Sequence, residues 1–174
     1  MLDDSPGFEF VKNLAAEYSG FARHVSLSTV DIETGEIWNL VDSMQSTREE
    51  DLTNRMIMNF EDINKYAIAS GSVPTAFPPT IIDGHMFVDG MTAYNLNAQE
   101  AIDRCRDLGY DDDKIIIDML VCKVTKDLNS WDSGYNSYQN FMYARNINDD
   151  HHNDDAVAGV KRANPNVNWR LEIF

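Results

Sequence analysis

Apolar positions along the first third of the chain change from the spacing of a helix to the spacing of a strand. A Ser-Pro pair at residues 5–6 is a typical helix start, and apolar positions behind it predict a helix ending near Gly20. His24–Ile32 then alternates between apolar and polar positions, and Glu36–Val41 does so again after a Gly-containing loop. This pattern predicts a hairpin. Residues 42–55 are polar without a period, which predicts an exposed connection.

The middle of the chain predicts two further helices around a second hairpin. The helix over Phe60–Ala67 ends before the prolines of the following segment, because proline cannot continue a helix. Thr80–Val88 reads as two apolar arms around an Asp-Gly pair, which is typical of a two-residue turn. Asn97 is a candidate helix cap, and Gly109 is a candidate end of the helix that follows.

The last part of the chain starts with a strong strand pattern and then weakens. Lys114–Val124 is almost continuously apolar, which predicts a strand buried on both faces of a sheet. Tyr138, Phe141 and Met142 indicate one more helix, and Trp169–Phe174 indicates a closing strand. The order of elements predicts an α/β fold. We expect one main part over residues 1–125 and an acidic extension over residues 126–174.

Composition and charge narrow the classes of function. The chain has 174 residues, with 14 basic against 29 acidic side chains and a net charge of −15. A surface this negative repels phosphate backbones and anionic headgroups, so neither nucleic-acid binding nor electrostatic docking to a membrane is expected. No apolar run is long enough to span a membrane, and no secretory signal is visible. Cys105 and Cys122 are expected to be free thiols, which favours a cytoplasmic location.

Asp89-Gly90 is the strongest candidate for chemistry. Asp83-Gly84 has matched apolar arms and is best explained as a hairpin turn. The residues after Asp89-Gly90, Met91 to Tyr94, do not alternate as a strand, so this second Asp-Gly leads from the sheet into a loop. A carboxylate at a strand end is a suitable way to present a base to a cleft. A plain turn is the alternative.

Four separate segments around this motif resemble the patatin-like phospholipase domain, in the order that the family has them. The four are residues 2–6 (D-x-S-P), residues 28–36 (a strand followed by T-G-E), residues 69–79 (A-S-x-x-x-P-x-x-F-P-P) and Val88-Asp89-Gly90 with Asn95. The resemblance covers residues 1–125. It implies an α/β sandwich with a mostly parallel sheet, hairpins and flanking helices. The N-terminal strands and the nucleophile elbow of that fold would be missing.

The resemblance also implies an activity and a site. In the family, an aspartate in the position of Asp89 is the general base of a Ser-Asp dyad that hydrolyses acyl esters of phospholipids or related lipids. No metal and no cofactor is implied, and the protein would lie peripheral to membranes. Gly90 and Asn95 fit the motif, whereas Met91 replaces a Gly or Ala of the family. A bulkier side chain there is expected to narrow the cleft or tilt Asp89.

The nucleophile of such a dyad is not found in the sequence. No G-x-S-x-G occurs in the 174 residues, and the chain starts at the D-x-S-P segment. We expect this chain alone to be inactive, as part of a longer enzyme whose true N-terminus is unseen. The alternative is a non-enzymatic remnant that binds lipid or a protein partner at an open sheet edge.

Two other sites can be considered from the residues. Ser70 or Ser72 with His85 and Asp89 would make an internal triad, but four strand residues separate the last two by about 13 Å. The acidic tract at residues 148–155 holds ligand-type side chains at adjacent positions, which point apart. A solvated loop is favoured there, and a loose cation site is the alternative.

Overall fold

The computed structural model describes residues 13, 20–21, 23–42, 54–93, 96–121 and 136–173. The chain forms two compact units, residues 1–93 with 103–109 and residues 94–102 with 110–174. Most of the predicted first helix and of the connection at 42–55 lies outside the described residues, as do Asn95 and Cys122. The predicted boundary at residue 125 also lies outside them and stays a prediction.

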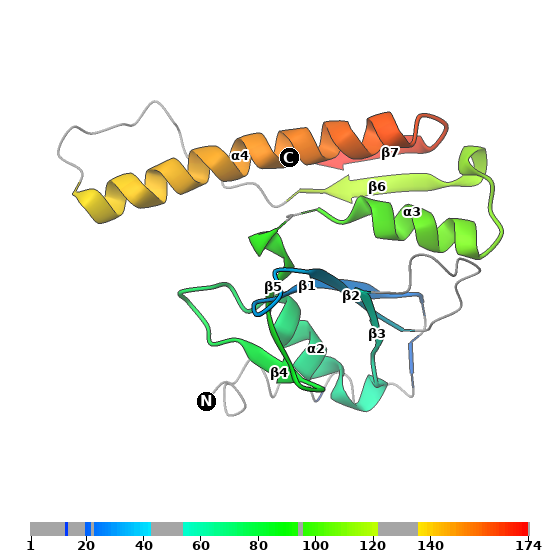
Figure 1. Cartoon of the computed structure of the whole chain (residues 1–174). Helices are drawn as coiled ribbons and strands as arrows, with labels where there is room; N and C mark the ends of the chain where they lie inside the picture. Colours follow the sequence, from blue (N-terminus) through cyan, green and yellow to red (C-terminus); the bar gives the residue numbers. More distant parts are fainter. Residues whose placement is uncertain are drawn as a thin grey trace. The chain divides into compact units, whose positions relative to one another are not determined.

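The first unit is built on a five-stranded sheet with the strand order β3-β2-β1-β5-β4 (Figure 1). Its strands are β1 (Ser26–Asp31), β2 (Ile37–Val41), β3 (Arg55–Ile57), β4 (Thr80–Ile82) and β5 (His85–Asp89). Both predicted hairpins are confirmed, since β1 pairs with β2 and β4 pairs with β5. Asp83 and Gly84 both have positive φ, which is the geometry of the type I′ turn that an Asp-Gly pair favours.

The α/β class is confirmed, but most strands of this sheet run antiparallel. β1 is antiparallel to both of its neighbours, and β4 is antiparallel to β5. Within this sheet, only the pairing of β2 with β3 is parallel among the described strands, and β3 was not expected from the sequence. Strands joined by short turns can pair only antiparallel, so the two hairpins by themselves oppose a mostly parallel sheet here.

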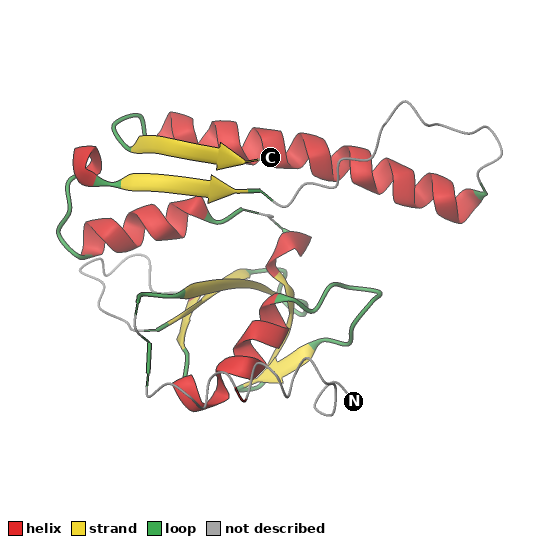
Figure 2. Ribbon diagram, turned by 180° about the vertical axis from the view of Figure 1, so that it is seen from behind, coloured by secondary structure: helices red, strands yellow, loops and turns green. Residues whose placement is uncertain are grey.

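One face of this sheet is covered by α2 (Ile63–Ser70), which follows a short 3₁₀ turn η3 (Phe60–Asp62) as predicted (Figure 2). Asn59 caps the turn, with its side-chain oxygen accepting from Glu61 N at 3.2 Å. The buried cluster between helix and sheet consists of Leu40, Met58, Tyr66, Ala69, Ile82 and Phe87. This cluster is the core of the first unit.

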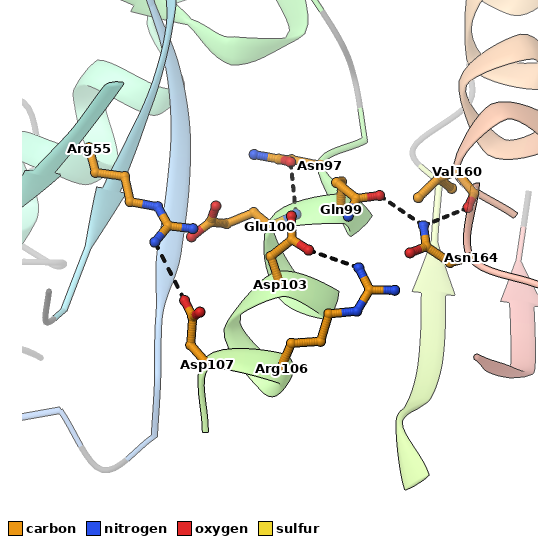
Figure 3. Close-up of polar contacts among 9 residues, drawn as sticks. All are labelled: Arg55, Asn97, Gln99, Glu100, Asp103, Arg106, Asp107, Val160 and Asn164. Carbon is orange, nitrogen blue, oxygen red and sulfur yellow. Dashed lines mark hydrogen bonds and ion pairs between the residues drawn. The ribbon is translucent and has the colours of Figure 1, made fainter. Parts of the chain in front are cut away.

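A buried ion pair lies in the same unit. Arg55 Nη1 of β3 lies 3.6 Å from Asp107 Oδ2, and their side chains are only 7% and 1% exposed (Figure 3). Asp107 is the last residue of α3 (Ala98–Asp107). Because an uncompensated charge inside a protein is costly, this pairing explains how β3 tolerates an arginine in a buried position.

The second unit contains a parallel pair of strands, β6 (Ile116–Leu120) and β7 (Asn168–Ile173), alongside the long helix α4 (Ser137–Ala163) (Figure 1). Met119, Val121 and Val157 form its buried cluster. Asn136 and Gln139 make a capping box at the start of α4. The predicted helix and closing strand in this region are confirmed.

Two further contacts fix the ends of helices in this unit. Asn97 caps α3 as predicted, with its side-chain oxygen accepting from Glu100 N at 3.3 Å. At the end of α4, Asn164 is almost fully buried, and its amide donates to Gln99 Oε1 and to Val160 O, both at 2.8 Å (Figure 3). These bonds use polar groups that a helix end would otherwise leave unsatisfied.

Two predictions for the second unit are wrong. The β6 strand is not buried on both faces, since Ile116 and Leu120 are 54% and 69% exposed and Asp118 pairs with Arg170 at 2.9 Å. The acidic tract is not a loop but part of α4. Among the described residues, no three His, Cys, Asp or Glu side chains gather as metal ligands would. No described helix combines the length and apolar character needed to cross a bilayer.

Replacing Phe87 with alanine tests the core of the first unit. Phe87 is fully buried, so Phe87→Ala should lower the free energy of unfolding by about 3–5 kcal/mol. Ile81, on the neighbouring strand β4, is exposed, and Ile81→Ala should change stability by less than about 0.5 kcal/mol. Urea unfolding followed by circular dichroism measures both. Equal losses in the two variants would contradict the described packing.

Candidate functional site

Asp89 is the last residue of β5, where the strand passes into a 3₁₀ turn, η4 (Gly90–Thr92). Its side chain caps this turn, because Asp89 Oδ1 accepts from Met91 N at 2.9 Å. The residue is half-buried, and within the described part of the chain its other oxygen, Oδ2, has no hydrogen-bond donor. One oxygen is therefore held by the backbone, whereas no described donor contacts the second.

Gly90 lies against the backbone of the neighbouring strand. A Cβ atom at this position would lie 2.5 Å from Ser28 O and 2.9 Å from Ser28 Cβ, both closer than real side chains come. The φ angle of Gly90 is not what requires glycine; the requirement is the lack of a side chain. Close approach to β1 thus explains why glycine follows Asp89.

Met91 contributes its backbone N–H to the turn, and its side chain is 38% exposed. The expectation that this side chain narrows a cleft or tilts Asp89 stays a prediction. Asn95, the remaining residue of the motif, lies outside the described residues.

The two serines near Asp89 are engaged with carbonyl groups. Ser72 is 1% exposed, and its hydroxyl donates to Ile68 O at 2.7 Å. The hydroxyl of Ser70 donates to Ser28 O at 2.8 Å. Neither proton is directed at a base, which agrees with the rejection of an internal triad.

His85 pairs with Asp31 and not with Asp89. His85 Nδ1 lies 2.8 Å from Asp31 Oδ2, and the backbone N–H of Glu33 donates to Asp31 Oδ1 at 2.9 Å. The Trp38 ring packs against the imidazole, with centroids 4.6 Å apart. His85 begins β5 and Asp89 ends it, so the His-Asp pair lies at the opposite end of the strand from the candidate base.

Asp31 is a buried carboxylate that the sequence analysis missed. The hydrogen bond from His85 lowers its pKa below the usual value of 3.8, although burial acts in the opposite direction. Its position in an alternating apolar strand could have revealed it, since β1 places Thr29 and Asp31 on one face. A charge at such a position needs a partner.

Replacing Gly90 with alanine tests the close approach to β1. Gly90→Ala should destabilise the protein by about 1–3 kcal/mol, because the new methyl group meets backbone atoms of Ser28. Gly159, within α4, has nothing within 4 Å of its virtual Cβ. Gly159→Ala should therefore stabilise by about 0.5–1 kcal/mol through helix propensity. Thermal unfolding compares the two, and a neutral Gly90→Ala would be inconsistent with the geometry.

The Asp31–His85 pair predicts a dependence of stability on pH. Because the pKa of Asp31 is lower in the folded state than the usual 3.8, its contribution to the free energy of unfolding is fully present above pH 3.8. This contribution is lost as the pH falls through the pKa of the folded state. Asp31→Asn should cost about 1–3 kcal/mol at pH 7, and this difference from the parent should shrink below pH 4. Urea unfolding between pH 7 and pH 2.5 measures it, with the exposed Asp83→Asn as the control. A difference that is constant with pH would refute the assignment.

Comparison with known proteins connects this geometry to a family. A search of curated proteins gives no match. A family model described as "Patatin-like phospholipase" matches residues 26–102. The matched region runs from the first residue of β1 into α3 and includes the whole of β5 and the Asp89-Gly90 turn. Residues 26–102 of this chain are thus similar to the patatin-like phospholipase domain.

Proposed function

We propose that this chain carries the base-bearing portion of a patatin-like lipid acyl hydrolase, with Asp89 as the proton acceptor of a Ser-Asp dyad. The family match over residues 26–102 supports a lipid-directed acyl hydrolase. The observation that carries the residue assignment is the geometry of Asp89. Its Oδ1 is fixed by Met91 N, and its Oδ2 has no donor within the described residues.

In this proposal the reaction uses one proton and no metal. The serine hydroxyl gives its proton to Asp89 Oδ2 as its oxygen attacks the acyl carbonyl of the lipid. Asp89 then returns the proton to the leaving alcohol, and water releases the acyl group in a second half-reaction. Gly90 and the capped turn hold the carboxylate at the end of β5 during both steps. Asn95 completes the motif.

The nucleophilic serine that this mechanism needs is not found in the sequence of the chain. The sequence has no G-x-S-x-G, and Ser70 and Ser72 donate to backbone carbonyls. We infer that the 174-residue chain alone does not hydrolyse lipid. The same proposal includes a cytoplasmic location and peripheral association with membranes.

A second candidate function rests on a different observation. Ile116 and Leu120 of β6 are large apolar side chains on an exposed face of the parallel strand pair. Parallel strands are normally covered on both faces, so this face is suited to binding lipid or a protein partner. In that case the chain is a non-enzymatic binding module, and Asp89 is only the cap of a turn.

The role of Asp89 can be tested by supplying the missing nucleophile. The 174 residues would be fused behind a patatin-like segment that contains a Gly-rich loop and a G-x-S-x-G motif. Asp89→Asn should then lower kcat/KM for a p-nitrophenyl acyl ester by roughly 100-fold or more, as expected for loss of a general base. Asp83→Asn, in the Asp-Gly turn between β4 and β5, should leave kcat/KM unchanged.

The unfused chain is the reference for this experiment. It should show no ester hydrolysis and no serine adduct with a fluorophosphonate probe. A fusion whose activity survives Asp89→Asn would reject Asp89 as the base. Labelling of a serine in the unfused chain would reject the inference that the chain alone is inactive.

A further inference from the structure

The end of α2 and the residues after it are linked to the Asp89-Gly90 turn through two serines. The backbone N–H of Asp89 donates to Ser72 O at 3.0 Å. Ser70 is linked to the turn indirectly, because its hydroxyl donates to Ser28 O, the same carbonyl that Gly90 approaches. Both serines therefore contact backbone atoms that determine where the turn lies.

Ser72 is itself held by two other elements. Its hydroxyl donates its single proton to Ile68 O in α2, at 2.7 Å. The Thr80 hydroxyl lies 3.2 Å from Ser72 Oγ, so in this contact Thr80 is the donor and Ser72 the acceptor. Ser72 is almost fully buried, and no water replaces these bonds easily. The end of α2 and the start of β4 are thus joined at the residue whose carbonyl binds Asp89 N.

We propose that Ser70 and Ser72 are positioning residues for Asp89, and that their hydroxyl groups fix the backbone from which its carboxylate is presented. The assignment of a catalytic purpose to this positioning rests on the proposed function. The hydrogen bonds of the two serines are observed independently of that proposed function. A base must be held in its productive geometry, and two hydroxyl-to-carbonyl bonds can contribute to this without placing another charge near Asp89.

The chain offers a matched pair of reporters for this proposal. The N–H of Met91 binds the carboxylate of Asp89, and the N–H of Glu33 binds the carboxylate of Asp31, each at 2.9 Å. Each amide proton shift in an NMR spectrum should follow the ionisation of its own carboxylate. Asp31 and Asp89 lie on adjacent strands of one sheet, so a general loosening of the fold would affect both reporters.

The experiment is an NMR pH titration of the intact 174-residue protein and its variants. In Ser72→Ala, the change in the Met91 amide proton shift with pH should fall to less than half of its size in the parent protein. Hydrogen exchange of the Asp89 amide with solvent should accelerate at least tenfold. The Glu33 shift should stay as in the parent. Ser70→Ala should reduce the Met91 shift in the same way, without the faster Asp89 exchange, because Ser72 then keeps the hydroxyl bonds that hold its carbonyl in place.

Thr80→Val keeps the proposal testable if Ser72→Ala does not fold. It is nearly isosteric and removes only the donor to Ser72 Oγ, so a smaller loss of the Met91 shift is expected. Ser137→Ala, which removes an exposed hydroxyl in the other unit, should change neither reporter. Unchanged Met91 and Asp89 signals in the Ser72 and Thr80 variants, or equal losses at Met91 and Glu33, would overturn the positioning role.

The outcome is separate from that of the proposed function. In the fusion enzyme, Ser72→Ala should lower kcat with little change in KM, because it displaces the base and not the lipid. If the NMR effects appear but Asp89→Asn leaves the fusion active, the positioning contacts stand and the catalytic assignment of Asp89 fails. If Asp89→Asn abolishes activity and the NMR effects are absent, the catalytic assignment of Asp89 stands and the positioning role of the serines fails.

Discussion

The register of β5 is the constraint on which the first unit depends. Phe87 is fully buried between the sheet and α2, and it pairs with Asp31 on one side and Thr80 on the other. Because side chains alternate along a strand, burying Phe87 puts His85 and Asp89 on the same face. A slip of one residue would move all three to the opposite face of the sheet, which is why the apolar core indirectly determines where the candidate base lies.

The two carboxylates along this part of the sheet show how position decides the role of an aspartate. Asp31 is buried and receives hydrogen bonds from His85 and from Glu33 N, so both of its oxygens serve the fold. Asp89 is half-buried at a strand end and uses Oδ1 for its own turn. The first carboxylate binds donors with both oxygens, whereas the second has one oxygen without a donor in the described structure.

In the second unit, the apolar pattern of β6 and the burial of its side chains do not agree. β6 pairs with one parallel strand among those described, and its inward residue Met119 packs with Val157 of α4 and with Val121, which directly follows the strand. Its outward residues Ile116 and Leu120 remain exposed within the described structure. The sequence pattern of a two-sided buried strand is therefore satisfied on one face only.

The amino-acid sequence by itself determined the local elements. Asp83-Gly84 predicted its hairpin, Asn97 its helix start and the prolines after α2 its end, because turns and caps depend on a few neighbouring residues. It also singled out the Asp89-Gly90 turn. Only the tertiary structure decided strand direction, the pairing of Asp31 with His85 and the contacts of Ser70 and Ser72. These join residues up to 54 positions apart, and no local pattern encodes which distant strands will be neighbours.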